Sequence, residues 1–296
     1  MKQLLIGSAV IAAMVFVLAG CEGAGTEDES LEGVIDVIGY DNDSTWRNDT
    51  ALFYTGEEGS DLVTLNSEVA DTQAMIDAVA ANPEAIGYLE YEAINRGSLN
   101  NTEDVTIVTV DSVQLTVANV RNGTYPHSLE LFLVWDTPQA DFAQDFVEFA
   151  ISDKGQDVID DGFLPIASPG SYTAATGVGT GFALGGSSTV NGIAAPLIDA
   201  YEGSEGQSNT DVIDGDYESV GSGAGAQGVI DGDYDLAGMS RDLTSEESTE
   251  GLENQLIGYT AWAFIVHPDA PVTAFTTAQL GDILTGTITQ WSGLSE

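Results

Sequence analysis

Short apolar runs alternate with segments of helical periodicity along this chain, and that alternation restricts its fold more than any other feature. Because strands that alternate with helices form mostly parallel sheets covered by helices, the sequence predicts an α/β protein. The predicted strands lie within Leu31–Tyr40, Ala85–Leu89, Val105–Val110, Leu129–Val134, Tyr234–Ala237 and Tyr259–Val266, and the predicted helices within Ala70–Ala81, Pro138–Ile159, Val190–Tyr201 and Thr277–Leu284.

The composition is strongly acidic for a folded protein. The chain of 296 residues has 6 Lys and Arg against 48 Asp and Glu, a formal net charge of -42, yet 43% of its residues are hydrophobic. That apolar content indicates one large or two ordinary domains with a core rather than a disordered polyanion. The acidic residues are spread along the chain, so we expect them to coat a surface suited to a salty, halophilic or marine medium. Such a coat repels nucleic acid, which is therefore not an expected partner.

The N-terminus has the proportions of an export signal. The apolar run Leu4–Leu18 is short for a membrane-spanning helix and is followed by Leu18-Ala19-Gly20-Cys21, which resembles a bacterial lipobox. Residues 1–20 are therefore predicted as a lipoprotein signal peptide, Cys21 as the lipidated residue and residues 21–30 as a solvated tether. The alternative is an ordinary cleavage site with an incidental cysteine. The prediction places the protein outside the cytoplasm, anchored by lipid in the periplasm or at the outer cell surface.

Three places in the second half of the chain have the make-up of an anion cradle. Gly186–Thr189 precedes a predicted helix, the glycine-rich stretch Ser222–Gly228 opens another, and Ser240-Arg241 follows a predicted strand. Glycine lets the backbone approach an anion closely, and the free N–H groups at a helix start point toward it. Each place alone is more often an ordinary helix cap. Three of them between residues 186 and 241 favour one shared anion site.

Other chemistry is poorly supported. Gly223, Gly225 and Gly228 satisfy G-x-G-x-x-G, but the helix that follows is too short for a dinucleotide fold. His127 and His267 are the two histidines, too few and too far apart in sequence to suggest zinc. The repeat of IDGDY, at 213–217 and 230–234, is turn chemistry and lacks the distal Glu of a calcium loop. No nucleophile with an adjacent base is evident, so the sequence predicts neither an enzyme nor a cofactor nor a metal site.

Six segments resemble the periplasmic phosphate-binding proteins of ABC transporters. Three late segments resemble the N-terminal half of that family: GGSSTVNGIAAPLIDAYE, ESVGSGAGAQGVIDGDYDLAGMSRDLTSEE and WAFIVHPDAPVTAFTTAQLGDILTGTITQW. Three earlier segments resemble its C-terminal half: AVAANPEAIGYLEY, VRNGTYPHSLELFLV and FVEFAISDKGQDVIDDGFLPI. The halves therefore stand in reverse order, which a circular permutation explains; a tandem duplication that lost its outer halves, or a truncated longer chain, are the alternatives.

The resemblance implies two α/β lobes that close on an ion about a hinge. One lobe would be discontinuous, made of residues 31–92 and 257–296. The other would be contiguous, residues 93–256, with a linker at 167–186. Crossing strands would lie near Tyr88–Glu92 and Ile257–Trp262.

The resemblance also implies four ligand-binding loops. In the fourth, between Tyr40 and Trp46, the family's arginine is replaced by Tyr40, which removes a contact worth roughly 1.5–3 kcal/mol. Arg47 or Arg241 is the candidate replacement. Carried over residue by residue, the ligand-binding positions are Ser188, Thr189 and Val190 in the first loop, Ser222 and Gly223 in the second, Ser240 and Arg241 in the third, and Ser44, Thr45 and Arg47 in or beside the fourth.

The function that the resemblance implies is capture of phosphate, or a related oxyanion, by an extracytoplasmic lipoprotein that delivers it to an ABC permease. The alternative is a surface lipoprotein with a structural or sensory role and a degenerate anion site. Affinity for an oxyanion separates the two.

Overall fold

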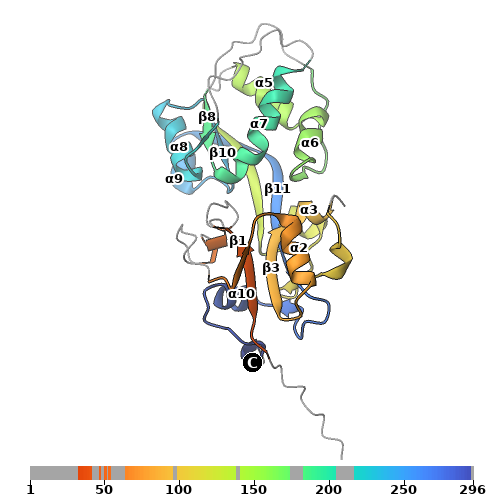
Figure 1. The fold of residues 1–296 in the computed structure, drawn as a ribbon. Coiled ribbons are helices and arrows are strands. Elements are labelled where there is room, and N and C mark those ends of the chain that lie inside the picture. The colour runs from red at the N-terminus through yellow and green to blue at the C-terminus, as the bar shows by residue number, and fades with distance from the viewer. Residues whose placement is uncertain are drawn as a thin grey trace, which may run out of the picture.

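A computed structural model describes residues 33–41, 47, 50, 51, 53, 54, 64–95, 99–137, 141–173, 183–204 and 217–294. The predicted signal peptide, Cys21, the tether, Ser44, Thr45 and residues 174–182 of the predicted linker lie outside the described residues. The chain forms two lobes, one above the other in the view of Figure 1, joined by the long strands β6 (Ser128–Asp136) and β11 (Leu252–Val266).

In the described part of the chain, ten strands form one sheet that runs through both lobes, in the order β2-β1-β3-β11-β6-β10-β8-β9, with β4 and β7 also paired to β11. Strands β1, β2 and β3 are parallel, as are β8, β9 and β10, whereas β6 and β11 are antiparallel to their neighbours. The predicted α/β class is confirmed, with a mixed rather than mostly parallel sheet. The remaining strands are β1 (Asp36–Tyr40), β2 (Ser67–Val69), β3 (Ala85–Glu90), β4 (Thr106–Ile107), β7 (Leu164–Pro165), β8 (Leu184–Gly186), β9 (Glu218–Ser219) and β10 (Leu236–Met239), and a separate pair β5 (Thr109–Val110) and β12 (Ala274–Phe275).

The two crossing strands, β6 and β11, pair with each other, and each also pairs with a strand of one lobe. β11 pairs with β6 from Leu252 opposite Asp136 to Ala261 opposite Ser128, with an irregularity in register between Leu256 and Gly258. Beyond that stretch β11 pairs with β3, and the far end of β6 pairs with β10. The predicted crossing segment Ile257–Trp262 lies within β11. The second crossing strand is β6 and not Tyr88–Glu92, because β3 ends in the lower lobe and leads into helix α3 (Tyr91–Asn95).

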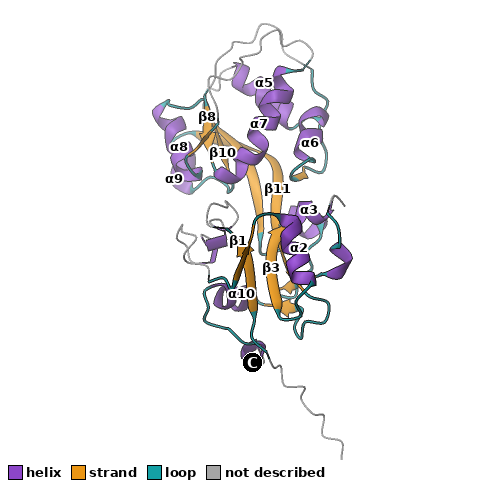
Figure 2. Ribbon diagram, viewed as in Figure 1, coloured by secondary structure: helices purple, strands orange, loops and turns teal. Residues whose placement is uncertain are grey.

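The lower lobe has its own apolar core, covered by helices α2 (Thr72–Ala80) and α10 (Thr277–Leu284), which Figure 2 labels. Helix α4 (Val117–Arg121) also packs against this core. Helix α2 begins after Asp71, whose carboxylate accepts a hydrogen bond from the Ala74 N–H (2.8 Å). Its apolar positions Met75, Ile76 and Val79 recur at helical spacing and are fully buried.

The boundary between the lobes differs from the one predicted at residue 92. Val105, Val108, Val120 and Tyr125 are buried in the lower core, because β4 pairs with β11 at Ile265 and β5 pairs with β12. The chain therefore leaves the lower lobe at the start of β6, some distance after the predicted point, and returns to it along β11.

The upper lobe packs α5 (Asp141–Ala150), α6 (Asp153–Ile159) and α7 (Ser188–Glu202) on one side and α8 (Ser222–Asp231) and α9 (Ser245–Thr249) on the other. The single helix predicted over 138–159 is two helices. Ser152 separates them, since its hydroxyl donates to the Phe149 carbonyl (2.6 Å) and caps α6 by accepting from the Gly155 N–H. Two tyrosine hydroxyls, from Tyr172 and Tyr201, converge on the buried Asp145 carboxylate and fasten α5 to α7.

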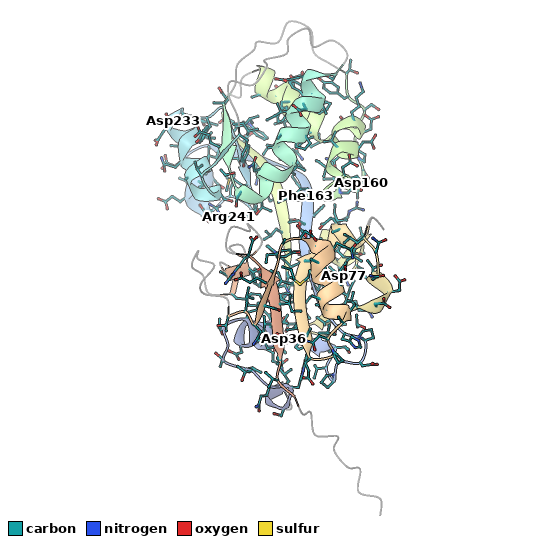
Figure 3. All side chains as sticks on the ribbon, viewed as in Figure 1. Asp36, Asp77, Asp160, Phe163, Asp233 and Arg241 are labelled. Atoms are coloured by element: carbon teal, nitrogen blue, oxygen red, sulfur yellow. The ribbon has the colours of Figure 1, made fainter. Side chains whose placement is uncertain are left out.

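Acidic side chains are distributed over both lobes. Among those labelled in Figure 3, Asp77 lies on the lower lobe and Asp160 and Asp233 lie on the upper lobe, whereas Arg241 lies on the side of the upper lobe that faces the lower one. Among the described helices, none is long and apolar enough to span a membrane.

Candidate functional site

A cavity of about 470 Å³ lies where the two lobes meet. Its upper wall comes from the starts of α7 and α8 and from the end of β10, its floor from the crossing strands and its lower side from Phe53. This is the size range of small-molecule sites, which run from about 300 to 1,000 Å³. The described residues that line it are Phe53, Leu129, Thr189, Val220, Gly221, Ser222, Gly223, Ala224, Ser240, Arg241 and Trp262.

Hydroxyl groups from three separate segments meet at the upper wall. Ser187 precedes α7, Ser222 begins α8 and Ser240 follows β10. The Ser187 hydroxyl donates to Ser240 Oγ (3.0 Å), Ser222 Oγ lies 3.3 Å from Ser240 Oγ, and the Ser240 N–H donates to Ser222 Oγ (3.2 Å). They meet because β8 and β10 are adjacent and parallel, so their carboxyl ends share one edge of the sheet. The three places predicted to form one site are thus adjacent in the structure.

Glycine residues allow α8 to begin directly against β8. Gly186 has φ +136°, and a Cβ there would collide with the carbonyl oxygen of Gly238. A Cβ on Gly225 would lie 2.7 Å from Gly186 Cα. The Gly221 N–H donates to the Gly186 carbonyl (2.8 Å), which ties the start of the helix to the end of the strand. This close approach sets Ser222 beside Ser240.

The N-terminus of α8 is open toward the cavity. Its N-cap residue is Gly221, with φ +88°, and no side chain caps the first turn. Within the described residues, the N–H groups of Ser222, Gly223 and Ala224 make no hydrogen bond, and all three residues line the cavity. Uncapped N–H groups with the helix dipole behind them bind anions. Helix α7 differs, because Ser187 caps it by accepting from the Thr189 N–H (3.2 Å).

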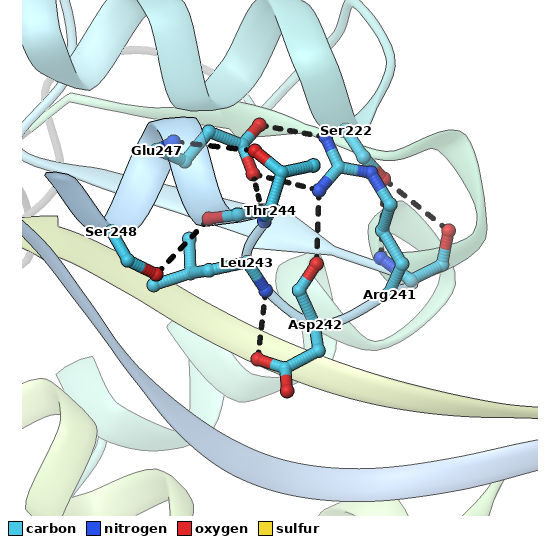
Figure 4. A network of polar contacts seen from close by, with 8 residues as sticks. Ser222, Arg241, Asp242, Leu243, Thr244, Glu247 and Ser248 are labelled. Carbon is cyan, nitrogen blue, oxygen red and sulfur yellow. Dashed lines mark hydrogen bonds and ion pairs between the residues drawn. The ribbon is translucent and has the colours of Figure 1, made fainter. Parts of the chain in front are cut away.

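Arg241 is the cation at this cavity within the described residues, and it is paired (Figure 4). Its Nη2 lies 2.7 Å from Glu247 Oε1, its Nη1 lies 2.8 Å from Glu247 Oε2, and Nη1 also donates to the Asp242 carbonyl (2.9 Å). The hydrogen bonds from Arg241 lower the pKa of Glu247 to about 2, so the pair is ionised at neutral pH.

Not every predicted ligand residue lines the cavity. Thr189, Ser222, Gly223, Ser240 and Arg241 do. Ser188 is solvent-exposed and is not among the lining residues, and the Val190 side chain is buried in the core of the upper lobe.

The predicted fourth loop contributes none of the lining residues that the structure describes. Ser44 and Thr45 are outside the described residues. Arg47 is buried, forms an ion pair with Glu68 (2.6 Å) and donates to the Tyr40 carbonyl (3.3 Å), away from the cavity. Of the two arginines considered as replacements, Arg241 is therefore the one that the structure sets at the cavity.

An aromatic cluster under the cavity was not anticipated. Phe53, Tyr54 and Trp262 surround the buried His127, and the Tyr54 hydroxyl lies 2.6 Å from His127 Nε2. Burial lowers the pKa of His127 to about 4, so the imidazole is neutral at neutral pH. Among the described residues no group of three or more His, Cys, Asp or Glu side chains could hold a metal ion. Of this cluster, Phe53 and Trp262 also line the cavity.

Two lobes joined by crossing strands, with hydroxyls and an open helix N-terminus in a cavity between them, define a two-lobe ligand-binding protein. The chain belongs to the PBP superfamily: the family model described as "PBP superfamily domain" matches residues 33–154 and 170–295. The predicted two-lobe fold is thereby confirmed.

The relatives are named as phosphate-binding proteins. Phosphate-binding protein PstS 2 of Streptococcus pneumoniae serotype 4 is 27% identical over 298 residues, covering 98% of this chain and 97% of that protein. Phosphate-binding protein PstS of Borreliella burgdorferi is 36% identical over 108 residues, which is 36% of this chain and 37% of that protein. The crystal structure of a phosphate-binding protein of a phosphate ABC transporter from S. pneumoniae TIGR4 superposes with a TM-score of 0.74 at 27% identity, covering 89% of this chain and all of that one.

These matches do not test whether the two halves of this chain are permuted relative to the wider family. The pneumococcal proteins align with nearly the whole of this chain, so the fold is shared from end to end. The circular permutation relative to the wider family stays a prediction.

Proposed function

We propose that this chain is an extracytoplasmic substrate-binding protein that captures phosphate, or a closely related tetrahedral oxyanion, and delivers it to an ABC permease. The observation that carries the proposal is the convergence of Ser222, Ser240 and the open N-terminus of α8 on one cavity between two lobes that β6 and β11 join. The names of the pneumococcal relatives supply the anion and the transporter class.

The cradle explains how so acidic a protein binds an anion. Backbone N–H groups and hydroxyls act over a few ångströms, and no carboxylate is among the described residues that line the cavity. Acidic side chains farther away than about 8 Å are largely screened at physiological salt. A positively charged surface is therefore not required.

The proposed role is binding without turnover. The described cavity wall carries hydroxyls that hydrogen-bond to one another, and no base lies beside them. The relatives are named as binding proteins, in agreement with the prediction that the chain is not an enzyme.

Membrane attachment is the finer part of the proposal. We assign the lipid anchor to Cys21, on the resemblance of Leu18–Cys21 to a lipobox, with residues 21–30 as the tether. Metabolic labelling with a radioactive fatty acid tests it: wild type should incorporate label, and Cys21→Ser should not. Equal labelling of both would refute the anchor.

Calorimetric titration of the chain from residue 22 onward tests the binding function, with phosphate as ligand and sulfate as comparison in about 1 M salt. Micromolar affinity for phosphate, about -8 kcal/mol, is expected. No heat with either anion would contradict the proposal and favour a surface protein with a degenerate site.

A further inference from the structure

The Arg241 guanidinium group is held from one end. Glu247 accepts from Nη1 and from Nη2, and the Asp242 carbonyl accepts from Nη1. Arginine has five N–H donors in one plane. Three are thus engaged, and within the described residues Nε–H and the second hydrogen of Nη2 make no hydrogen bond.

The two remaining donors lie on the same edge of the guanidinium plane. In arginine, Nη1 is cis to Cδ about the Nε–Cζ bond and Nη2 is trans to it. The Nε–H and the outer N–H of Nη2 therefore point in the same direction. Such a two-donor edge matches two oxygens of a carboxylate or phosphate. The end-on bond to Glu247 therefore leaves intact the edge that binds an oxyanion bidentately.

That edge adjoins the open start of α8. A Cβ placed on Gly223 would be 3.9 Å from Arg241 Nη2, and both residues line the cavity. Figure 4 shows the guanidinium bonded to the Glu247 carboxylate, and Ser222 lines the same cavity as Arg241. On the basis of the proposed function, we propose that Glu247 is a positioning residue: it fixes Arg241 so that the Nε and Nη2 edge meets the oxyanion held by α8.

Glu247 is itself rigidly mounted. Its Oε2 also accepts from the Thr244 N–H (2.7 Å), and the Glu247 N–H donates to Thr244 Oγ1 (3.2 Å), which makes a capping box at the start of α9. The position of the guanidinium therefore depends on the position of α9, through the Glu247 carboxylate. It also cancels the charge of Arg241, so its two effects on an anion have opposite signs.

Substitution of Glu247 by glutamine separates these effects. Glutamine is accepted in a capping box, so α9 keeps its start. It offers one acceptor instead of two, so Arg241 loses its bidentate support. If Glu247 positions Arg241, E247Q should weaken phosphate binding about tenfold or more, even though one negative charge has been removed. If charge alone mattered, E247Q should bind phosphate more tightly.

Glu246→Gln is the matched control, because Glu246 is exposed in the same turn and, among the described residues, makes no hydrogen bond or ion pair with Arg241. It removes the same charge and should leave phosphate affinity within about twofold. Arg241→Lys keeps the charge but not the two-donor edge and should weaken binding by a similar factor to E247Q.

Titration calorimetry of wild type, E247Q, E246Q, R241K and the double variant R241K/E247Q with phosphate decides the proposal. We expect E247Q to weaken binding in wild type and to have no further effect in the R241K background. Unchanged or tighter binding by E247Q, with wild type still binding phosphate, would overturn the positioning role and leave the proposed function standing. Absence of phosphate binding by folded wild type would refute both.

Discussion

At the residue scale, Ser222 is the side chain most directly tied to the proposed ligand. It starts α8, lines the cavity and contacts Ser240. Loss of a hydrogen bond to a charged ligand costs about 1.5–3 kcal/mol, so Ser222→Ala should weaken phosphate binding about tenfold to a hundredfold. Ser222→Asp should abolish it, because a carboxylate would face the anion. Calorimetry measures both.

Ser188→Ala is the matched control for that experiment. Ser188 is a hydroxyl at the start of the neighbouring helix, but it is exposed and is not among the lining residues. Its removal should leave the affinity unchanged. If Ser188→Ala weakened binding and Ser222→Ala did not, the ligand would lie at α7 instead of α8.

His127 gives the second prediction at this scale. Burial lowers the pKa of His127 from 6.5 to about 4 on folding. Between about pH 4 and pH 6.5 the unfolded chain therefore binds a proton that the folded chain does not. The corresponding stability, on the order of 3 kcal/mol, is present above pH 6.5 and is lost as the pH falls through about 4.

Urea unfolding at several pH values measures this contribution. The difference in unfolding free energy between wild type and His127→Gln should change with pH in that window. A parallel curve for His127→Gln would mean that the imidazole is not buried as the structure has it.

The local sequence predicted the segments that line the cavity more accurately than it predicted the individual residues that do so. Ser222, Ser240 and Arg241 were predicted and line the cavity. Consecutive residues of α7 have different environments, because Thr189 lines the cavity whereas Val190 is packed in the core. The direction of each side chain depends on how the helix packs, which no local motif encodes.

At the element scale, the approach of α8 to β8 depends on small residues. A Cβ on Gly225 would lie 2.7 Å from Gly186 Cα, so Gly225→Ala should destabilise the protein by roughly 1–3 kcal/mol through overpacking. Helix propensity alone predicts the opposite, a gain of about 0.5–1 kcal/mol. Thermal unfolding distinguishes the two signs.

Gly162→Ala is the control, because a Cβ there would meet nothing within 4 Å. That substitution should be neutral or slightly stabilising. A Gly225→Ala protein as stable as wild type would show that α8 can withdraw from the strand.

Element type was predicted more accurately than element pairing. The segment 129–134 was predicted as a strand and lies within β6, but its role as a crossing strand depends on its partners β10 and β11, which are distant in sequence. The lobe boundary was misplaced for the same reason. Val105 and Val110 enter the lower core through pairing with residues more than a hundred positions away.

At the scale of the whole molecule, a net charge of -42 repels itself when the chain is compact. The Debye length falls from about 10 Å at 0.1 M salt to about 3 Å at 1 M. The midpoint of thermal unfolding should therefore rise by about 5 °C or more between these NaCl concentrations, equivalent to roughly 2 kcal/mol. Sucrose of equal osmolality, which does not screen charge, should raise it less. A midpoint of unfolding that does not depend on NaCl would mean that repulsion among the acidic side chains destabilises the folded state very little.

We expect the two lobes to close on the oxyanion when it binds. Phe53 and Val220 are large apolar side chains, 38% and 43% exposed, that line the cavity from opposite lobes, and closure is expected to cover them. Small-angle X-ray scattering with and without saturating phosphate measures this directly, with Ser222→Asp as control. We expect phosphate to reduce the radius of gyration of wild type and to leave that of Ser222→Asp unchanged. Phosphate binding with no change in the wild-type radius would contradict closure of the lobes, and the same change in both proteins would contradict capture at this cavity.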